Sequence, residues 1–187
     1  EGERFWNELH GFHAERPEKS RPKMYGHGRV LGRDARTPDK AEACARQLLL
    51  SAARRLRRDD LRATELTLDF RGGSREQSLK WGWRETFTAA RDDHTFIRAL
   101  ARGLAEARQS LPFSPRSVSV TLHGIQSENE ITGDLFGGAL DDSATTDQRK
   151  KWETVSDLVD TLRRTHGSKA LSFGTQDEIE GGFVGAK

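Results

Sequence analysis

Residues 54–71, RRLRRDDLRATELTLDFR, join the two patterns that decide the fold of this chain. Upstream, apolar residues recur at three- and four-residue steps through 41–56, which places them on one face of a helix. Downstream, Leu66, Leu68 and Phe70 alternate with polar residues, the period of a strand with one covered and one exposed face. The connection between the two is short, so we expect the helix to pack back against the sheet.

The rest of the chain repeats these two periodicities. Residues 23–31 mix aromatic, glycine and β-branched residues and predict a first strand, and Thr37-Pro38 is typical of a helix start. Alternation predicts strands at 77–88 and 117–124, and between them lies an amphipathic helix that ends near Ser110. This β-α-β-β-α-β order predicts an α+β fold, a four-stranded sheet that carries both helices on one face.

The predicted domain organisation has four parts. Residues 1–12 form the end of a helix, and residues 13–22, with two prolines and no periodicity, form a tether. Residues 23–125 form the domain itself. Residues 126–187 form a flexible tail that begins with a segment rich in Gly, Ser, Thr and Asp and contains one further amphipathic helix at about 148–165.

The net charge of +2 conceals an uneven distribution. Residues 1–125 contain 24 Lys and Arg against 17 Asp and Glu, or +7, whereas residues 126–187 contain 7 against 12, or −5. A basic domain suits a polyanion, since neutralised phosphates release their counterions. An ordinary solvated surface explains the same composition. Because the predicted helices cover only one face of the sheet, nucleic acid is the natural candidate for the other.

Composition also bears on the membrane and on redox chemistry. No apolar run approaches the ~18 residues that a membrane-spanning helix needs, so we expect no membrane partner and a cytoplasmic location. Cys44 is the only cysteine and cannot form an internal disulfide. Its position on the apolar helix face favours a small buried side chain over a nucleophile or a metal ligand.

The acidic pairs and the histidines form no catalytic or metal-binding motif. Asp92-Asp93 precedes a helix and is explained by capping and by the helix dipole. Asp59-Asp60 lies in the helix-to-strand turn, and Asp141-Asp142 lies in the tail. The histidines are too scattered in sequence to suggest a triad or a metal site.

The paired tryptophans have two interpretations. Trp81 and Trp83 can act as platforms on which bases stack. Their alternation with Lys80 and Arg84 instead places them on the face that the helices cover. We therefore predict that they pack in the core.

The order of these motifs resembles one known family. Lys23-Met24-Tyr25-Gly26-His27 is similar to the Lys-Ser-Ile-Gly-His strand that opens the little-finger domain of Y-family translesion DNA polymerases, the DNA polymerase IV type in particular. Arg55-Leu56-Arg57 and the strand 63–70 follow at the distances at which that family has an RLR helix end and an alternating strand. Residues 5–11 resemble the end of its thumb domain, and the next segment resembles its interdomain tether. The resemblance covers residues 4 to about 125.

The resemblance implies a role in DNA repair, in translesion synthesis and the SOS response. In that family the little finger lies against duplex DNA and grips its backbone, so primer-template DNA is the expected partner. Nucleotidyl transfer belongs to the palm domain, whose carboxylates hold two metal ions. We find no equivalent carboxylates, so we expect no cofactor in this chain and assign Mg²⁺ to the palm of an active parent polymerase.

The expected DNA contacts lie along the strands. The resemblance assigns phosphate contact to Lys23, Gly26 and His27 on the first strand. The pattern adds residues on the outward face or at the start of a strand: Arg29, Lys80, Arg84, Arg116, Thr121 and His123. Each of these is equally explained as a solvated polar group. Met24 stands where the family has serine, and Ser117 and Thr121 stand where relatives often place arginine, so a weaker grip is expected.

One segment of the tail carries a second resemblance. Thr132-Gly133-Asp134-Leu135-Phe136 is similar to the Gln-Leu-Asp-Leu-Phe type of peptide with which bacterial polymerases dock on the sliding clamp. Such a segment inserts a Leu-Phe pair into an apolar pocket. The resemblance implies that Asp134, Leu135 and Phe136 contact the clamp, although the first two positions differ. The alternative is a Leu-Phe anchor that packs on the domain itself.

Three hypotheses for the function follow. The first is the DNA-binding little finger of a translesion polymerase, and the second is a clamp-binding scaffold in a catalytically inactive relative. The third is an unrelated nucleic-acid-binding module of similar topology. In each, we interpret residues 54–71 as the scaffold that sets the sheet. Its arginines before Ala63 are expected at the sheet's edge, while other strands supply the open face.

Overall fold

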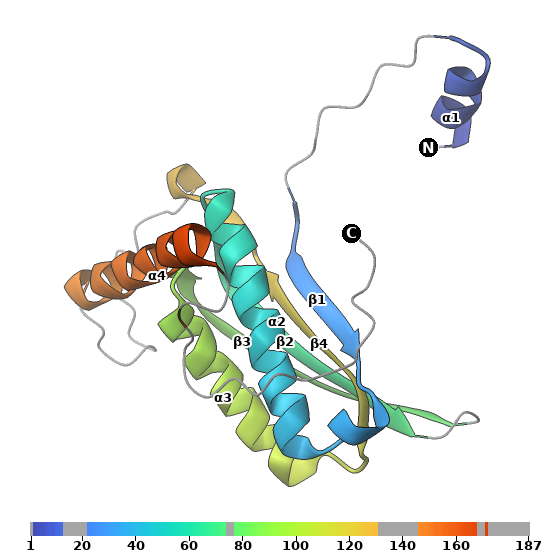
Figure 1. The fold of residues 1–187 in the computed structure, drawn as a ribbon, viewed down its shortest axis with the longest axis vertical. Coiled ribbons are helices and arrows are strands. Elements are labelled where there is room, and N and C mark those ends of the chain that lie inside the picture. Colours follow the sequence, from blue (N-terminus) through green and yellow to red (C-terminus); the bar gives the residue numbers. More distant parts are fainter. Residues whose placement is uncertain (1, 13–21, 74–76, 131–145, 168–170, 172–187) are drawn as a thin grey trace.

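The predicted transition from helix to strand is present in the computed structural model of the chain (Figure 1). Helix α2 (Pro38–Arg58) begins after Thr37 at its N-cap, and strand β2 (Leu61–Gly73) starts after a two-residue turn. Asp60 in that turn has a φ of 52°, a left-handed conformation that aspartate tolerates better than most residues. The structure describes residues 2–12, 22–73, 77–130, 146–167 and 171.

The remaining elements follow the predicted order, with one short 3-10 helix added before α2 and two short elements added after the last long strand. They are α1 (Gly2–Leu9), β1 (Tyr25–Val30), the 3-10 helix η1 (Arg33–Ala35), β3 (Ser78–Ala90), α3 (Asp93–Ser110), β4 (Pro115–His123), β5 (Gln126–Ser127), the 3-10 helix η2 (Glu128–Glu130) and α4 (Thr146–His166). The α+β fold is therefore confirmed. Residues 126–130 were predicted as part of a flexible tail but instead form β5 and η2, because β5 pairs with the start of β2.

The long strands form one antiparallel sheet in the order β1-β4-β2-β3. Strand β2 is central, with β4 on one side and β3 on the other, while β1 is an edge strand. This corrects the prediction for residues 54–71: their strand half supplies the middle of the sheet. Strand β3 follows β2 directly in the chain, but β4 comes only after β3 and α3. Alternation alone therefore did not reveal that β2 lies between β3 and β4.

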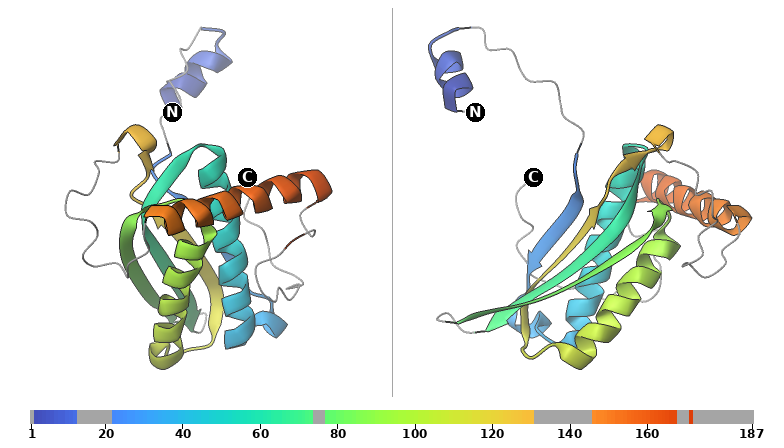
Figure 2. Two further views of the ribbon diagram at one scale, coloured as in Figure 1. Left: turned by 90° about the vertical axis from the view of Figure 1, so that its left-hand side faces the viewer. Right: turned by 180° about the vertical axis from the view of Figure 1, so that it is seen from behind.

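Helices α2 and α3 cover one face of the sheet and leave the other open (Figure 2). The inward residues of β2, Leu66, Leu68 and Phe70, are at most 2% exposed against these helices. The tryptophans also lie on the covered face, as predicted. Trp83 fits against Gly103 of α3, where an added Cβ would lie 2.5 Å from a ring carbon. The core thus occupies the layer between sheet and helices.

Helix α4, predicted at about 148–165, crosses the ends of α2 and α3 on the covered side (Figure 2, left). The Trp152 ring stacks on His94 with 4.2 Å between ring centroids and 1° between planes. Val159 is 5% exposed, and the Ser156 hydroxyl accepts the Asp93 amide at 3.0 Å. The tail helix is therefore packed on the domain.

Candidate nucleic-acid interface

The open face of the sheet is a grid of small and polar residues. Its positions follow from the register, because residues that pair with one another across antiparallel strands point to the same face. Three rows run from β1 through β4 and β2 to β3: Gly26, Thr121, Thr67 and Arg84; Gly28, Ser119, Asp69 and Gly82; Val30, Ser117, Arg71 and Lys80. Val30 is the one aliphatic side chain in these rows, so this face is suited to a polar partner.

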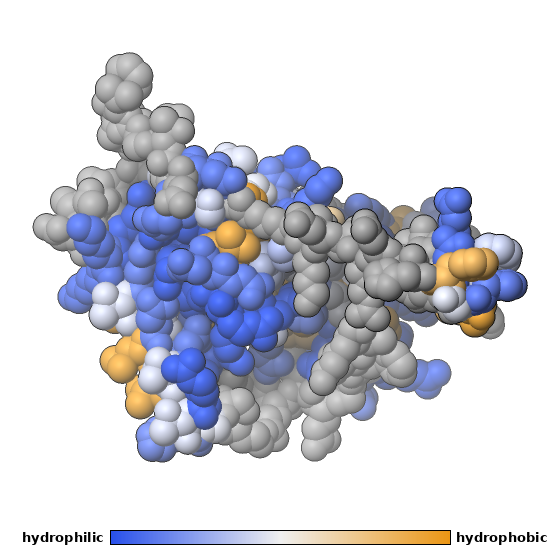
Figure 3. Space-filling view, turned by 90° about the horizontal axis from the view of Figure 1, so that it is seen from above, coloured by the Kyte–Doolittle hydropathy of each residue, from blue (hydrophilic) through white to orange (hydrophobic). Residues whose placement is uncertain are grey.

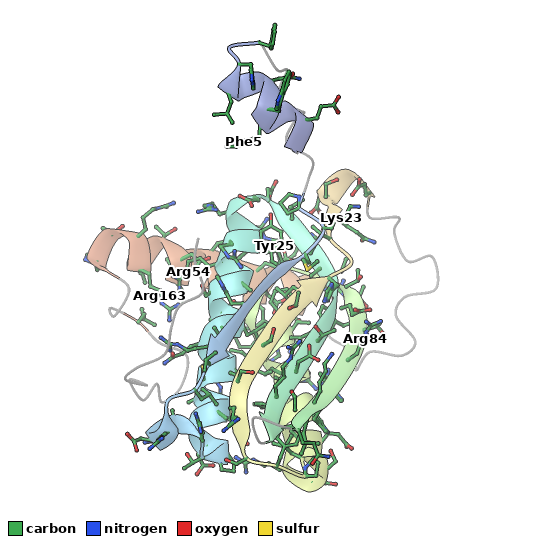
Figure 4. The ribbon with its side chains drawn as sticks, turned by 90° about the vertical axis from the view of Figure 1, so that its right-hand side faces the viewer. Phe5, Lys23, Tyr25, Arg54, Arg84 and Arg163 are labelled. Carbon is green, nitrogen blue, oxygen red and sulfur yellow. The ribbon has the colours of Figure 1, made fainter. Side chains whose placement is uncertain are left out.

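Four of the predicted contact residues reach this face with their side chains. Lys80 and Arg84 come from β3, whereas Thr121 and His123 come from β4. The imidazole Nε2 of His123 lies 3.2 Å from the hydroxyl of Thr67 on β2. Figure 4 views the open face and shows Arg84 on the strand at the far side from β1. The structure therefore brings these four residues to one surface.

Two predicted residues of β1 point the other way. Arg29 and His27 share a face with Val118 and Val120 of β4, both buried, and so turn toward α2. Arg29 lies beside the thiol of Cys44 there. Burial, with a smaller contribution from Arg55, lowers the pKa of His27 below its ordinary value, so the ring is neutral at pH 7. The predicted outward direction of Arg29 was wrong.

The other three predicted residues lie at the borders of the sheet. Lys23 is exposed just before β1, near the top of the strand in Figure 4. Arg116 is exposed near the start of β4, where its carbonyl accepts the Leu31 amide at 2.7 Å. Gly26 lies on β1 directly opposite Thr121. The nine predicted DNA contacts thus divide between the open face, its borders and the covered face.

The close approach of Gly26 to Thr121 gives a testable prediction. A Cβ added to Gly26 would lie 2.4 Å from the Thr121 hydroxyl and 2.9 Å from its Cβ, whereas one added to Gly28 would make ordinary contacts at 3.6 Å. We expect Gly26→Ala to lower the free energy of unfolding by about 1–3 kcal/mol in urea denaturation. Gly28→Ala is the matched control and should not destabilise the domain. Equal effects of the two variants would contradict a steric requirement at Gly26.

Ion pairs moderate the charge of the open face. Lys80 lies 3.4 Å from Asp69, and Arg84 lies 3.4 Å from Glu65. The basic partners are 62% and 67% exposed, respectively, so each pair is weak and can be exchanged for a phosphate. Arg71, which was not among the predicted contacts, pairs with no carboxylate among the described residues. Its alternation with Phe70 was the signal that could have placed it on this face.

The outer edge of β1 offers main-chain donors beside this face. The Leu31 amide donates toward β4, so the amides of Tyr25, His27 and Arg29 do so too. The amides of Gly26 and Gly28 alternate with these and point to the free edge. Backbone amides bind phosphate without regard to base sequence.

Carboxylates of the tail pair with arginines at the end of α2, at the start of β2 and just after β3. Arg57 is buried and donates to both Asp93 and Asp160 at 2.7 Å. The other ion pairs between domain and tail join Arg54 to Asp160, Arg62 to Glu128 and Glu153, and Arg91 to Asp157. Figure 4 shows Arg54 beside α4, on the side away from the open face. The charge asymmetry is thus partly satisfied within the chain.

The acidic pairs have structural partners. Asp92 caps α3 by accepting the Thr95 amide at 2.7 Å, as predicted, and Asp93 binds Arg57. Among the described residues, no group of three or more His, Cys, Asp or Glu side chains could hold a metal ion.

None of the described helices combines the length and apolarity of a membrane span. Hydrophilic residues also dominate the view along the long axis in Figure 3.

The predicted clamp contacts Asp134, Leu135 and Phe136 lie outside the described residues. Arg62 pairs with Glu128, which precedes this segment in the chain, and with Glu153, which follows it. Clamp docking by this segment stays a prediction from the sequence.

The fold and its open face define a class of small α+β domain that presents a polar antiparallel sheet as a binding surface. The chain belongs to the family described as impB/mucB/samB family C-terminal domain, which matches residues 22–135. This is the little-finger domain of Y-family polymerases, and little-finger domains contact DNA in translesion synthesis and repair. A comparison with curated proteins finds no match for the chain.

Proposed function

We propose that this chain binds the backbone of primer-template DNA without sequence preference, as the little finger of a translesion polymerase. The observation that carries the proposal is the open face itself, where small residues of β1 and β4 lie beside Arg71 of β2 and beside Lys80 and Arg84 of β3. Small side chains let a duplex approach closely, and flexible cations can follow its phosphates. Such a face makes few contacts that distinguish one base from another, as copying any template requires.

The physical properties of the face support weak binding. Asp69 and Glu65 compete with phosphate for Lys80 and Arg84. His27, a predicted contact, lies on the covered side of the sheet instead and is neutral at pH 7. The domain therefore contributes affinity and position, while nucleotidyl transfer belongs to the palm of the parent polymerase, whose carboxylates would hold Mg²⁺. In such an enzyme the chain would act in the cytoplasm during DNA repair.

Salt dependence tests this proposal. We expect the affinity of the full chain for a fluorescent primer-template duplex to fall by about 10²-fold between 50 and 200 mM KCl, for about four phosphate contacts. Two duplexes of unrelated sequence should bind equally. Fluorescence anisotropy measures both. Arg71→Gln should weaken binding several-fold, whereas Arg108→Gln on the helix side serves as the matched control. Affinity that is absent, or flat with salt, would refute the proposal.

Clamp docking through Asp134, Leu135 and Phe136 is a second proposal. It is supported only by the resemblance of residues 132–136 to clamp-binding peptides. The catalytically inactive scaffold differs from the active polymerase in the palm, which this domain does not contain. The choice between those two parents therefore depends on residues of the palm.

A further inference from the structure

Arg55 differs from the other arginines of its helix end. Arg54, Arg57 and Arg58 each lie within 4 Å of a carboxylate, whereas no carboxylate pairs with Arg55 among the described residues. Its Nη2 instead donates to the carbonyl oxygen of Gly26 at 3.0 Å. A guanidinium that has only a neutral acceptor keeps its full positive charge available to a ligand.

The contact with Gly26 places Arg55 at the free edge of β1. The Leu31 amide donates toward β4, and the register makes Tyr25, His27 and Arg29 do the same. The amide and carbonyl of Gly26 consequently both point away from the sheet. Arg55 reaches this carbonyl from α2, which underlies β1 and β4. The guanidinium and the outward Gly26 amide are therefore neighbours.

The arginine is also held in position. Its guanidinium carbon lies 5.8 Å from the centre of the Tyr25 ring, in a cation-π arrangement. The Tyr25 hydroxyl donates to Asp59 at 2.5 Å, and the ring is 5% exposed. Burial and this hydrogen bond raise the pKa of Tyr25 to about 12, so the phenol stays protonated. A side chain ordered in advance loses less entropy when it binds a ligand.

We propose that Arg55 is a further phosphate-binding residue, which reaches around the free edge of β1 and holds a backbone phosphate beside the Gly26 amide. The inference rests on the proposed DNA binding and extends it from the open face to the α2 side of the edge. It also changes the interpretation of residues 54–71. The stretch is scaffold at Arg54, Arg57 and Arg62, which bind carboxylates of the tail, and ligand-binding at Arg55.

The test compares Arg55→Gln with Arg58→Gln in the full chain. Glutamine keeps a neutral polar group and part of the side-chain stem, so Arg55→Gln removes the charge together with the hydrogen bond to Gly26. The salt slope separates the two effects, because only the loss of charge changes it. Arg58 is the matched control because its side chain is 74% exposed at the same helix end. The probe is the fluorescent primer-template duplex, and anisotropy is recorded from 50 to 200 mM KCl.

We expect Arg55→Gln to lower duplex affinity about tenfold and to reduce the salt slope by about one. Arg58→Gln should change affinity less than about twofold. Arg55→Lys should restore the slope, since a point charge still binds phosphate. Equal affinities of Arg55→Gln and Arg58→Gln, or a lower affinity with an unchanged slope, would overturn the inference. If the unaltered chain does not bind the duplex at all, the proposed function, on which this inference rests, would be refuted instead.

Discussion

Replacing Arg57 by methionine lowers the free energy of unfolding by about 3–5 kcal/mol, the range expected when one partner of a buried ion pair is removed. The Arg57 side chain is 3% exposed and donates to Asp93 and Asp160, as well as to the carbonyl of Arg91 at 2.9 Å. Methionine fills much of the same volume but offers no donor. Two carboxylates are then left beside an apolar side chain, and their lost hydrogen bonds dominate the effect.

The size of this effect should depend on pH. Burial raises the pKa of Asp93 above its ordinary value, and Arg57 opposes that rise. In the variant the pKa of Asp93 rises further, so the folded state binds a proton more tightly than the unfolded state over a wider range of pH. The stabilisation from that proton is complete below the unfolded pKa of about 3.9 and is lost as pH rises through the folded pKa. The difference between variant and wild type should therefore be largest near pH 7 and smaller at pH 4.

Urea denaturation at both pH values measures the effect of Arg57→Met. Arg58→Met is the matched control, since Arg58 is one position away, is exposed, and pairs only with its neighbour Asp59 at 3.6 Å. We expect little change from the control. A loss below about 1 kcal/mol in Arg57→Met, or one that does not vary with pH, would mean that Arg57 contributes to the fold mainly through packing.

Removal of α4 should also destabilise the domain strongly. A chain that ends at residue 145 retains the whole family match but loses Asp160, Glu153 and the Trp152 ring. We expect a loss of at least about 3 kcal/mol, because Arg57 loses one of its two carboxylates and the apolar surface under Val159 is exposed to water. Urea denaturation of the shortened and the full chain gives the difference directly.

Two variants within the full chain separate docking from chain length. Val159→Ala removes a buried side chain and should cost about 1–2 kcal/mol, whereas Leu158→Ala, at a position 57% exposed, should cost little. Arg57→Met should in turn cost less in the shortened chain, because Asp160 is already absent. Equal stability of the shortened and full chains would contradict the docking of α4. The expected result extends the folded unit beyond the family match to about residue 166.

The clear periodicities predicted the fold well. Leu66, Leu68 and Phe70 are buried as their alternation indicated, and Thr37 stands at the start of α2. The direction of the side chains on the first strand was harder to predict, because Gly26 and Gly28 have no side chains whose polarity could show which face is covered. Arg29 was therefore placed outward, although it turns under the sheet beside Cys44. On an edge strand a long polar side chain can face inward and still reach water.

Part of the candidate interface was also predictable from the alternation of residues along the strands. The alternation of β3 and β4 placed Lys80, Arg84 and Thr121 on the open face, since one residue in two must point there. Arg71 was missed because its strand was expected to lie away from that face. Arg55 could not be found from pattern alone, because its contact with Gly26 joins residues 29 positions apart.

The sequence by itself determined the helices and strands, their order, the family, and which residues of the central strands face the core. Each of these depends on local periodicity or on short motifs. Only the tertiary structure decided which of the arginines in 54–71 are neutralised by the tail and which one stands at the edge of β1. Arg57 and Asp160 are 103 positions apart, and a run of like charges contains no information about its distant partners. The physical reason is that an ion pair depends on distance and burial, which the packing of α4 on α2 and α3 sets.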